Sequence, residues 1–177
     1  LNGQLLGSYA FYWGQKQERT PTWFGMLTED GNLTEAVDAM QYAWTGGWPA
    51  NRTPRVEAML LGGKDATESV RLMPGDTVEA KIDVRDPDGD PVTYRWELKP
   101  ESAATSGGGD YEEPVTSLAG FLSDPGAAMT TLTAPAPGRY RLFAYASDEL
   151  GRIAHANIPF LVENERVVRL PAHASRR

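Results

Sequence analysis

The sequence predicts a mainly β fold, an antiparallel β-sandwich preceded by a short strand, a loop and a helix. Two observations carry this prediction. Apolar and polar residues alternate with a period of two in several segments after residue 55, which is the pattern of strands that bury one face. Turn residues, chiefly Pro, Gly, Asp and Asn, separate these segments, and strands divided by such turns are typical of a sandwich.

The N-terminal part differs from the rest because it offers one apolar run and one helix. The run, residues 5–13 (LLGSYAFYW), is typical of a buried parallel strand. A helix is predicted over residues 33–44, where apolar side chains recur three and four residues apart. Asn32 or Thr34 is its predicted N-cap, and Gly46 is its predicted end.

A linker is predicted to divide the chain near Asn51. The stretch PANRTP contains two prolines and has no apolar periodicity, which is typical of a connection between domains. We therefore expect a β/α unit over residues 1–50, a linker at 51–54, a sandwich over 55–163 and a tail at 164–177. The sequence begins without an initiator Met or a signal-peptide layout, so we expect it to be the C-terminal piece of a longer protein.

Four strands of the sandwich stand out as alternating segments: residues 78–84, 92–98, 140–146 and 154–162. The turn DPDGDP separates the first two, so we expect them to be neighbours in one antiparallel sheet. Trp96 belongs to the apolar face of the second strand and should lie at the centre of the sandwich. Phe143 and Tyr145 belong to the face opposite Leu142, where we expect them either to stack on a ligand or to lie beneath a neighbouring domain. If the sandwich docks on a barrel, we expect the neighbouring domain to cover them.

Charge and composition narrow the range of partners. The 177 residues are 41% hydrophobic and 23% charged, close to globular averages, with a formal charge of −7. This charge argues against polyanionic partners, such as nucleic acid and anionic membranes, since no Lys/Arg cluster reverses it locally apart from Arg176 and Arg177. No apolar run reaches about 18 residues, the length of a membrane span. The absence of cysteine excludes disulfides and thiolate metal sites.

A family resemblance lies within the predicted sandwich. Residues 86–98 (DPDGDPVTYRWEL) resemble a turn and strand of PKD and cadherin-like domains, and residues 138–162 resemble the closing hairpin of these domains. The resemblance implies an Ig-like, PKD-like antiparallel β-sandwich. It says little about a ligand, because such domains serve as spacers, adhesion modules and sugar binders.

The N-terminal segment resembles a different family. Residues 7–27 (GSYAFYWGQKQERTPTWFGML), followed by TEAVDAMQYAW, are similar to the last strand, loop and helix of the TIM barrel of bacterial glycoside hydrolases that act on β-glucans. A whole barrel needs roughly 250 residues, so a barrel cannot be complete here. The resemblance implies a glycoside hydrolase as the parent protein, with its catalytic carboxylates on earlier strands that this chain lacks.

In that family the loop after this strand carries an aromatic residue that lines a sugar subsite, and Trp13 matches it. Tyr12, Gln15 and Trp23 are nearby in the sequence, and aromatic rings with amide groups are suited to contacting sugars. We therefore predict these four as substrate-binding residues for a polysaccharide or oligosaccharide. The alternative is that both tryptophans simply pack against the helix that follows.

The acidic turn is a candidate metal site. Asp86, Asp88 and Asp90 alternate along the chain, a spacing that can aim several oxygen ligands at one Ca²⁺. Asp and Gly are also the residues that turns prefer without any metal, so a simple turn is the alternative. No cofactor other than this Ca²⁺ is expected.

No catalytic residue is predicted. Glycoside hydrolysis needs two carboxyl groups about 5–10 Å apart, and nothing in the spacing of Glu18, Glu29 and Asp30 makes them converge. His155 falls on the outward face of the last strand and His173 in the tail. We therefore predict a non-catalytic accessory region of a carbohydrate-active enzyme that is secreted, periplasmic or on the cell surface. Its partners would be polysaccharide and the remainder of its own catalytic domain; the alternative is a stand-alone extracellular binding or adhesion module.

Overall fold

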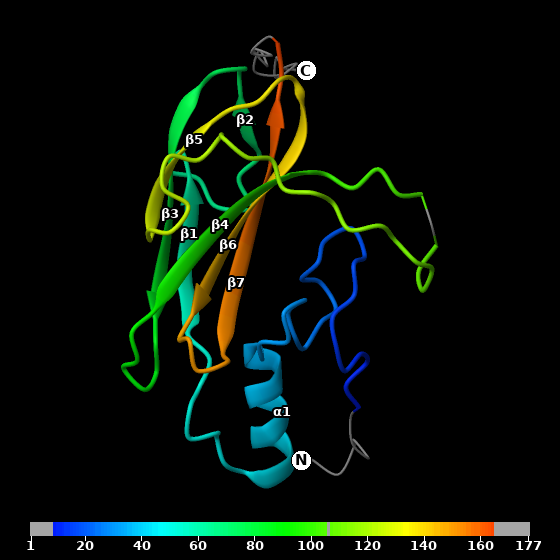
Figure 1. Ribbon diagram of the computed structural model, residues 1–177, viewed down its shortest axis with the longest axis vertical. Coiled ribbons are helices and arrows are strands. Elements are labelled where there is room, and N and C mark those ends of the chain that lie inside the picture. Colours follow the sequence, from blue (N-terminus) through cyan, green and yellow to red (C-terminus); the bar gives the residue numbers. More distant parts are fainter. Residues whose placement is uncertain (1–8, 106, 165–177) are drawn as a thin grey trace, which may run out of the picture.

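The computed structural model describes residues 9–105 and 107–164, which form two β-sheets and one helix (Figure 1). One sheet has the strand order β1-β3-β5, built from β1 (Arg55–Leu61), β3 (Thr77–Arg85) and β5 (Met129–Thr133). The other has the order β2-β7-β6-β4, built from β2 (Val70–Leu72), β7 (Ile153–Val162), β6 (Gly138–Ser147) and β4 (Thr93–Pro100). Neighbouring strands are antiparallel except β2 and β7, which are parallel. The predicted mainly β sandwich is confirmed.

The core lies between the two sheets and consists of the inward side chains of the alternating strands. Four leucines contributed by both sheets are fully buried: Leu61, Leu98, Leu132 and Leu142. Trp96 lies among them with 3% of its surface exposed, and its Nε1 donates a hydrogen bond to the Ala127 carbonyl at 2.8 Å. The predicted burial of Trp96 is therefore confirmed.

The expectation that the first two predicted strands are neighbours is wrong. These strands are β3 and β4, and they belong to different sheets. A tight hairpin needs a short turn, whereas here one oxygen of Asp86 accepts hydrogen bonds from the backbone N–H groups of Asp88 and Asp90, at 2.8 and 3.0 Å. These bonds and the left-handed Gly89 (φ 84°) close a wider loop, which carries the chain from one sheet to the other.

The predicted helix is present as α1 (Glu35–Thr45), with Thr34 at its N-cap position and Gly46 as its C-cap. Gly46 has φ 76°, a left-handed conformation that glycine adopts freely, and its N–H donates to the Tyr42 carbonyl. Of the strand predicted over 5–13, residues 9–13 have no strand structure and the rest lies outside the described residues. No helix in the described ranges is long and apolar enough to cross a membrane.

The N-terminal segment, here residues 9–34, runs beside β7 and is joined to its start (Figure 1). The Leu33 N–H donates to the Gly151 carbonyl, and the Leu33 carbonyl accepts a hydrogen bond from the Ile153 N–H, both at 2.9 Å. Leu33 thereby forms a one-residue parallel bridge beside the first residues of β7. Backbone hydrogen bonds thus fix where this segment enters α1.

The helix α1 is attached to the sandwich by a buried ion pair. Asp38, 1% exposed, lies 2.6 Å from Arg152 Nη1 and accepts a hydrogen bond from the Thr53 N–H at 2.7 Å. The Asn51 amide donates to Asp148 across the same junction at 2.8 Å. The predicted linker residues therefore make specific hydrogen bonds, while the division of the chain into two domains near Asn51 remains a prediction.

A second, smaller cluster lies on the outer face of the four-stranded sheet. Phe143 and Tyr145, only 2% and 5% exposed, form it together with Ile153. Residues 17–30 of the N-terminal segment border small cavities against these two rings, so this segment lies over them. The N-terminal segment therefore covers these two rings together with Arg95 and Lys99 of β4, whose charged groups lie over the Tyr145 and Phe143 rings.

Candidate functional site

A cleft of about 840 Å³ lies on the outer face of the sheet β2-β7-β6-β4. Residues 19–23 of the N-terminal segment form one wall, strands β2, β7 and β6 form the floor, and Glu101 and Ser102 border it after β4. Sites for small ligands usually have volumes of about 300–1,000 Å³ and combine apolar walls with a few polar groups. The size of this cleft therefore suits a short segment of a polymer or a compact ligand.

The register of the strands determines which side chains share the floor. Arg71 of β2 pairs with Leu161 of β7, and Leu161 pairs in turn with Arg139 of β6, so two arginines flank one leucine. Arg141 lies two residues further along β6, on the same face and opposite Pro159. Because neighbouring strands are about 4.8 Å apart, three arginines from distant parts of the sequence border one cleft.

The three floor arginines differ in their partners. Arg141 donates to Glu101 through Nε at 3.0 Å and Nη2 at 2.8 Å, and also to the side-chain oxygen of Asn157. Arg71 lies 2.7 Å from Glu163, in a pair whose side chains are 48% and 28% exposed. Arg139 forms no ion pair with any residue of the described ranges.

The wall of the cleft is anchored by a buried carboxylate. Glu112, 7% exposed, accepts hydrogen bonds from the Arg19 N–H at 3.1 and 3.2 Å, from the Gln17 amide at 3.2 Å and from the Ser102 hydroxyl. The hydrogen bonds from the Ser102 hydroxyl and then the Arg19 N–H lower the pKa of Glu112 below its usual value. Arg19 has φ 61°, in the left-handed region that residues other than glycine avoid, and this anchoring holds it there.

Of the four residues predicted to contact sugar, Trp23 lines the cleft. Its side chain is 63% exposed, and its ring is stacked on that of Phe24 with 5.0 Å between the centroids. Because one face of the Trp23 ring packs on Phe24, the other face is a flat apolar surface beside the polar groups of the floor. This combination is the one that stacking on a sugar ring requires.

The other three predicted residues lie outside this cleft. Trp13 packs on Trp44 of α1, with 6.0 Å between the ring centroids, which agrees with the packing alternative. Gln15 donates its amide N–H to the Pro21 carbonyl at 3.2 Å and so supports the loop that leads to the cleft. Tyr12 is 40% exposed. Sugar binding by any of the four remains a prediction.

Exposed aromatic side chains are concentrated in the N-terminal part of the chain. Eight lie between residues 9 and 48: Tyr9, Phe11, Tyr12, Trp13, Trp23, Tyr42, Trp44 and Trp48. Clustered exposed apolar surface marks places where a protein contacts a ligand or another protein surface. These residues therefore form a candidate surface for contact with a ligand or with another protein surface.

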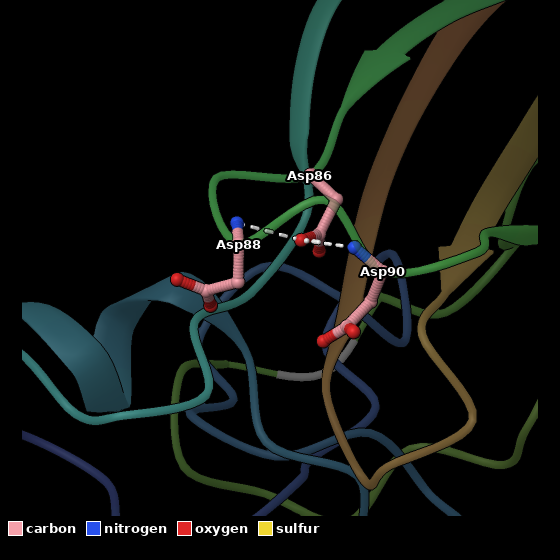
Figure 2. Close-up of side chains that lie close together, drawn as sticks. All are labelled: Asp86, Asp88 and Asp90. Atoms are coloured by element: carbon pink, nitrogen blue, oxygen red, sulfur yellow. Dashed lines mark hydrogen bonds between the residues drawn. The ribbon is translucent and has the colours of Figure 1, made fainter.

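The three aspartates of the acidic turn converge (Figure 2). Asp86, Asp88 and Asp90 each place one carboxylate oxygen within 4.8 Å of the others. Calcium–oxygen distances of about 2.3–2.6 Å allow ligand oxygens on one ion to be up to about 5 Å apart. Asp86 Oδ2 is buried without a hydrogen-bond partner in the described residues, whereas Asp88 Oδ2 accepts the Arg52 N–H at 2.6 Å. The hydrogen bonds to Asp86 Oδ1 also agree with the alternative, in which these aspartates form a turn without a metal. Binding of Ca²⁺ therefore remains a prediction.

Residues 65–158, just over half of the chain, match the PKD domain family. The chain belongs to this family. PKD domains are accessory or binding modules and are typically extracellular. The match begins ahead of β2 and ends within β7, so it spans six of the seven strands in whole or in part. No curated protein matches the chain.

Solved structures that share features with this PKD protein are distant from it. A nucleoside hydrolase-related hypothetical protein from Saccharophagus degradans, associated with carbohydrate metabolism, shares 17% sequence identity at a TM-score of 0.42. The match covers 71% of this chain and 29% of that one, so the present chain spans less than a third of the Saccharophagus protein. A conjugative transposon lipoprotein from Bacteroides eggerthii shares 16% identity at a TM-score of 0.32, with 61% of this chain and 94% of that chain covered.

The cleft of this PKD protein was not predicted from its sequence. The alternation of β6 placed Arg139 and Arg141 on the outward face, which was the one available signal. Arg71 lies on the three-residue strand β2, which is too short to show a period. Glu112, which anchors the wall, lies in a long irregular segment, where no periodic pattern in the sequence indicates which side chains are buried.

Proposed function

We propose that this PKD protein is the non-catalytic C-terminal accessory region of a carbohydrate-active enzyme and binds polysaccharide through the cleft beside Trp23. The observation that carries the proposal is the position of Trp23, an exposed indole ring at the edge of a cleft whose floor offers guanidinium and amide donors. Sugar rings have apolar faces and hydroxyl-bearing edges, so they bind where an aromatic plane adjoins such donors.

The parent protein in this proposal is a bacterial glycoside hydrolase that is secreted, periplasmic or on the cell surface. Membership of the PKD family and the resemblance of the N-terminal segment to the end of a glycoside hydrolase barrel support it. The remainder of the catalytic domain would then lie against exposed aromatic residues outside the cleft, such as Trp44 and Trp48. In the alternative, a stand-alone adhesion module, no upstream barrel exists and the chain binds polysaccharide or protein by itself.

Trp23→Ala tests the proposal, with Trp44→Ala as a matched control. The two tryptophans are 63% and 62% exposed, but Trp44 lies on α1 outside the cleft. Affinity electrophoresis in gels containing β-glucans, other neutral polysaccharides or acidic polysaccharides measures binding. We expect Trp23→Ala to weaken binding to at least one polymer about tenfold, equivalent to about 1.4 kcal/mol, and Trp44→Ala to leave it unchanged.

Two outcomes would contradict the proposal. Absence of binding to every polymer would remove polysaccharide as a ligand of this chain. Equal losses in the two variants, or a larger loss in Trp44→Ala, would move the binding surface from the cleft to the aromatic residues around α1.

A further inference from the structure

We infer that the polysaccharide bound in this cleft is acidic, carrying carboxylate groups on its sugar rings. The inference rests on the proposed function and adds the ligand class. Its starting point is the charge of the lining, which opposes that of the protein. The chain has a formal charge of −7, yet four arginines line the cleft and Glu101 is the one lining carboxylate in the described residues.

The arginines are available to a ligand to different degrees. Arg139 has no ion-pair partner within the described ranges, and its position on β6 is exposed. Arg71 and Glu163 form an exposed pair, and such pairs are weak enough for a ligand carboxylate to compete with. Arg141 is held in place by Glu101 and Asn157, which fixes its guanidinium beside the other two.

Arg19 adds a fourth cation from the opposite wall. Its guanidinium forms no ion pair within the described ranges, although the nearby Glu112 reduces its field. The Glu112 carboxylate is occupied by its backbone, amide and hydroxyl donors. The backbone at Arg19 has φ 61°, where glycine would be free of strain, so arginine is not the residue that this turn prefers for its conformation alone.

The chemistry of these groups favours a carboxylated sugar polymer. A guanidinium binds a carboxylate through two parallel hydrogen bonds, and Arg71 and Arg139 flank Leu161, two strand spacings or about 10 Å apart across the floor. A polymer that carries carboxylates along its chain can present one to each arginine, while the Trp23 ring stacks on the face of a sugar ring. Nucleic acid fits less well, because its high charge density is repelled by the negative protein surface outside the cleft.

The test compares Arg139→Gln and Arg19→Gly with Arg55→Gln. Arg55 is a control outside the cleft, since it lies on β1 and forms an exposed ion pair with Glu35 of α1. The probes are polygalacturonate, a neutral β-glucan, dextran sulfate and single-stranded DNA, each in gel affinity electrophoresis at two salt concentrations. We expect both cleft variants to bind polygalacturonate about tenfold more weakly, while Arg55→Gln binds it as the unchanged protein does. Arg19→Gly relieves the left-handed strain, so its melting temperature should not fall, and lost binding cannot be ascribed to unfolding.

The outcomes separate this inference from the proposed function. Binding of β-glucan that depends on Trp23 but not on Arg139 or Arg19 would overturn the acidic ligand and leave the polysaccharide site in place. Dextran sulfate or single-stranded DNA bound as tightly as polygalacturonate would overturn it as well, by showing that charge alone is recognised. No binding to any sugar polymer would overturn both proposals.

Discussion

Removing the Asp38 carboxylate tests whether the N-terminal segment, α1 and the sandwich unfold as one unit. Asp38→Ala deletes the buried partner of Arg152 and the acceptor of the Thr53 N–H. The Arg152 side chain is 13% exposed, so its charge would stay largely buried without a counter-ion. We therefore expect a large loss of stability from a single residue that lies outside the core between the sheets.

The magnitude follows from burial. Breaking a buried ion pair by removing one partner costs about 3–5 kcal/mol, a large part of the about 5–15 kcal/mol by which a small protein is stable. Glu35→Ala is the matched control, because it removes the other carboxylate of α1 that reaches the sandwich, through Arg55 at 3.2 Å. That pair is 57% and 48% exposed, and such pairs contribute about 0–1 kcal/mol.

Urea unfolding measures both variants, followed by tryptophan fluorescence and by far-ultraviolet circular dichroism. If the parts unfold together, the two probes report one transition, whose midpoint falls strongly in Asp38→Ala and little in Glu35→Ala. An Asp38→Ala protein within about 1 kcal/mol of the unchanged protein would refute the reasoning. An early transition confined to the N-terminal tryptophans, with the sandwich unaffected, would instead support two domains that meet near Asn51.

Three further predictions concern the sandwich. Trp96→Ala should lower the free energy of unfolding in urea by about 3–5 kcal/mol, since it leaves a cavity in the core and the Ala127 carbonyl without its partner. A change near zero would contradict the position of Trp96 in the core. If the acidic turn binds Ca²⁺, adding Ca²⁺ should raise the melting temperature, because a Ca²⁺ concentration of a hundred times the dissociation constant stabilises the fold by about 2.7 kcal/mol. Asp90→Asn should abolish this rise. Identical melting curves in EDTA, Mg²⁺ and Ca²⁺ would show that the turn binds no Ca²⁺. Burial lowers the pKa of His155, so the folded state favours the neutral ring, and stability should decline as the pH falls below about 6.5, where the unfolded chain takes up a proton. His155→Gln should flatten this part of the thermal-unfolding profile, and equal slopes would show that other groups govern it.

The sequence predicted the strands in which apolar and polar residues alternate over a long segment. β3, β4, β6 and β7 have eight to ten residues each, long enough for a period of two to be visible. The remaining strands hide this signal for physical reasons. β1 contains a bulge between Val56 and Ala58 that breaks its alternation, β2 has three residues, and β5 is the five-residue segment MTTLT, in which threonines obscure the pattern.

The sequence predicted where the strands lie along the chain better than it predicted which strands pair. The DPDGDP turn carries the residue types of a hairpin, but the hydrogen bonds to Asp86 Oδ1 use them to connect two sheets instead. Residue types at a turn specify local backbone conformation and do not specify which strand lies alongside. The same limit hid the arginine cleft, because Arg71 and Arg139 meet only through the pairing of β2, β7 and β6. Net charge averages over the whole chain and therefore could not reveal the sign of one site.

The N-terminal segment has two roles that depend on the same docked position. It lies over Phe143 and Tyr145, beside Arg95 and Lys99 of β4, and it contributes Arg19 and Trp23 to the wall of the cleft. The cleft is therefore not a property of the sandwich by itself, since its floor belongs to the PKD fold and one wall does not. Docking is maintained by the Glu112 hydrogen bonds at the cleft wall and by two contacts away from the cleft, the Leu33 bridge and the Asp38 ion pair. It follows that a change that loosens these contacts disturbs the wall as well as lowering the stability, and that a sandwich lacking the N-terminal segment would lose the proposed polysaccharide site.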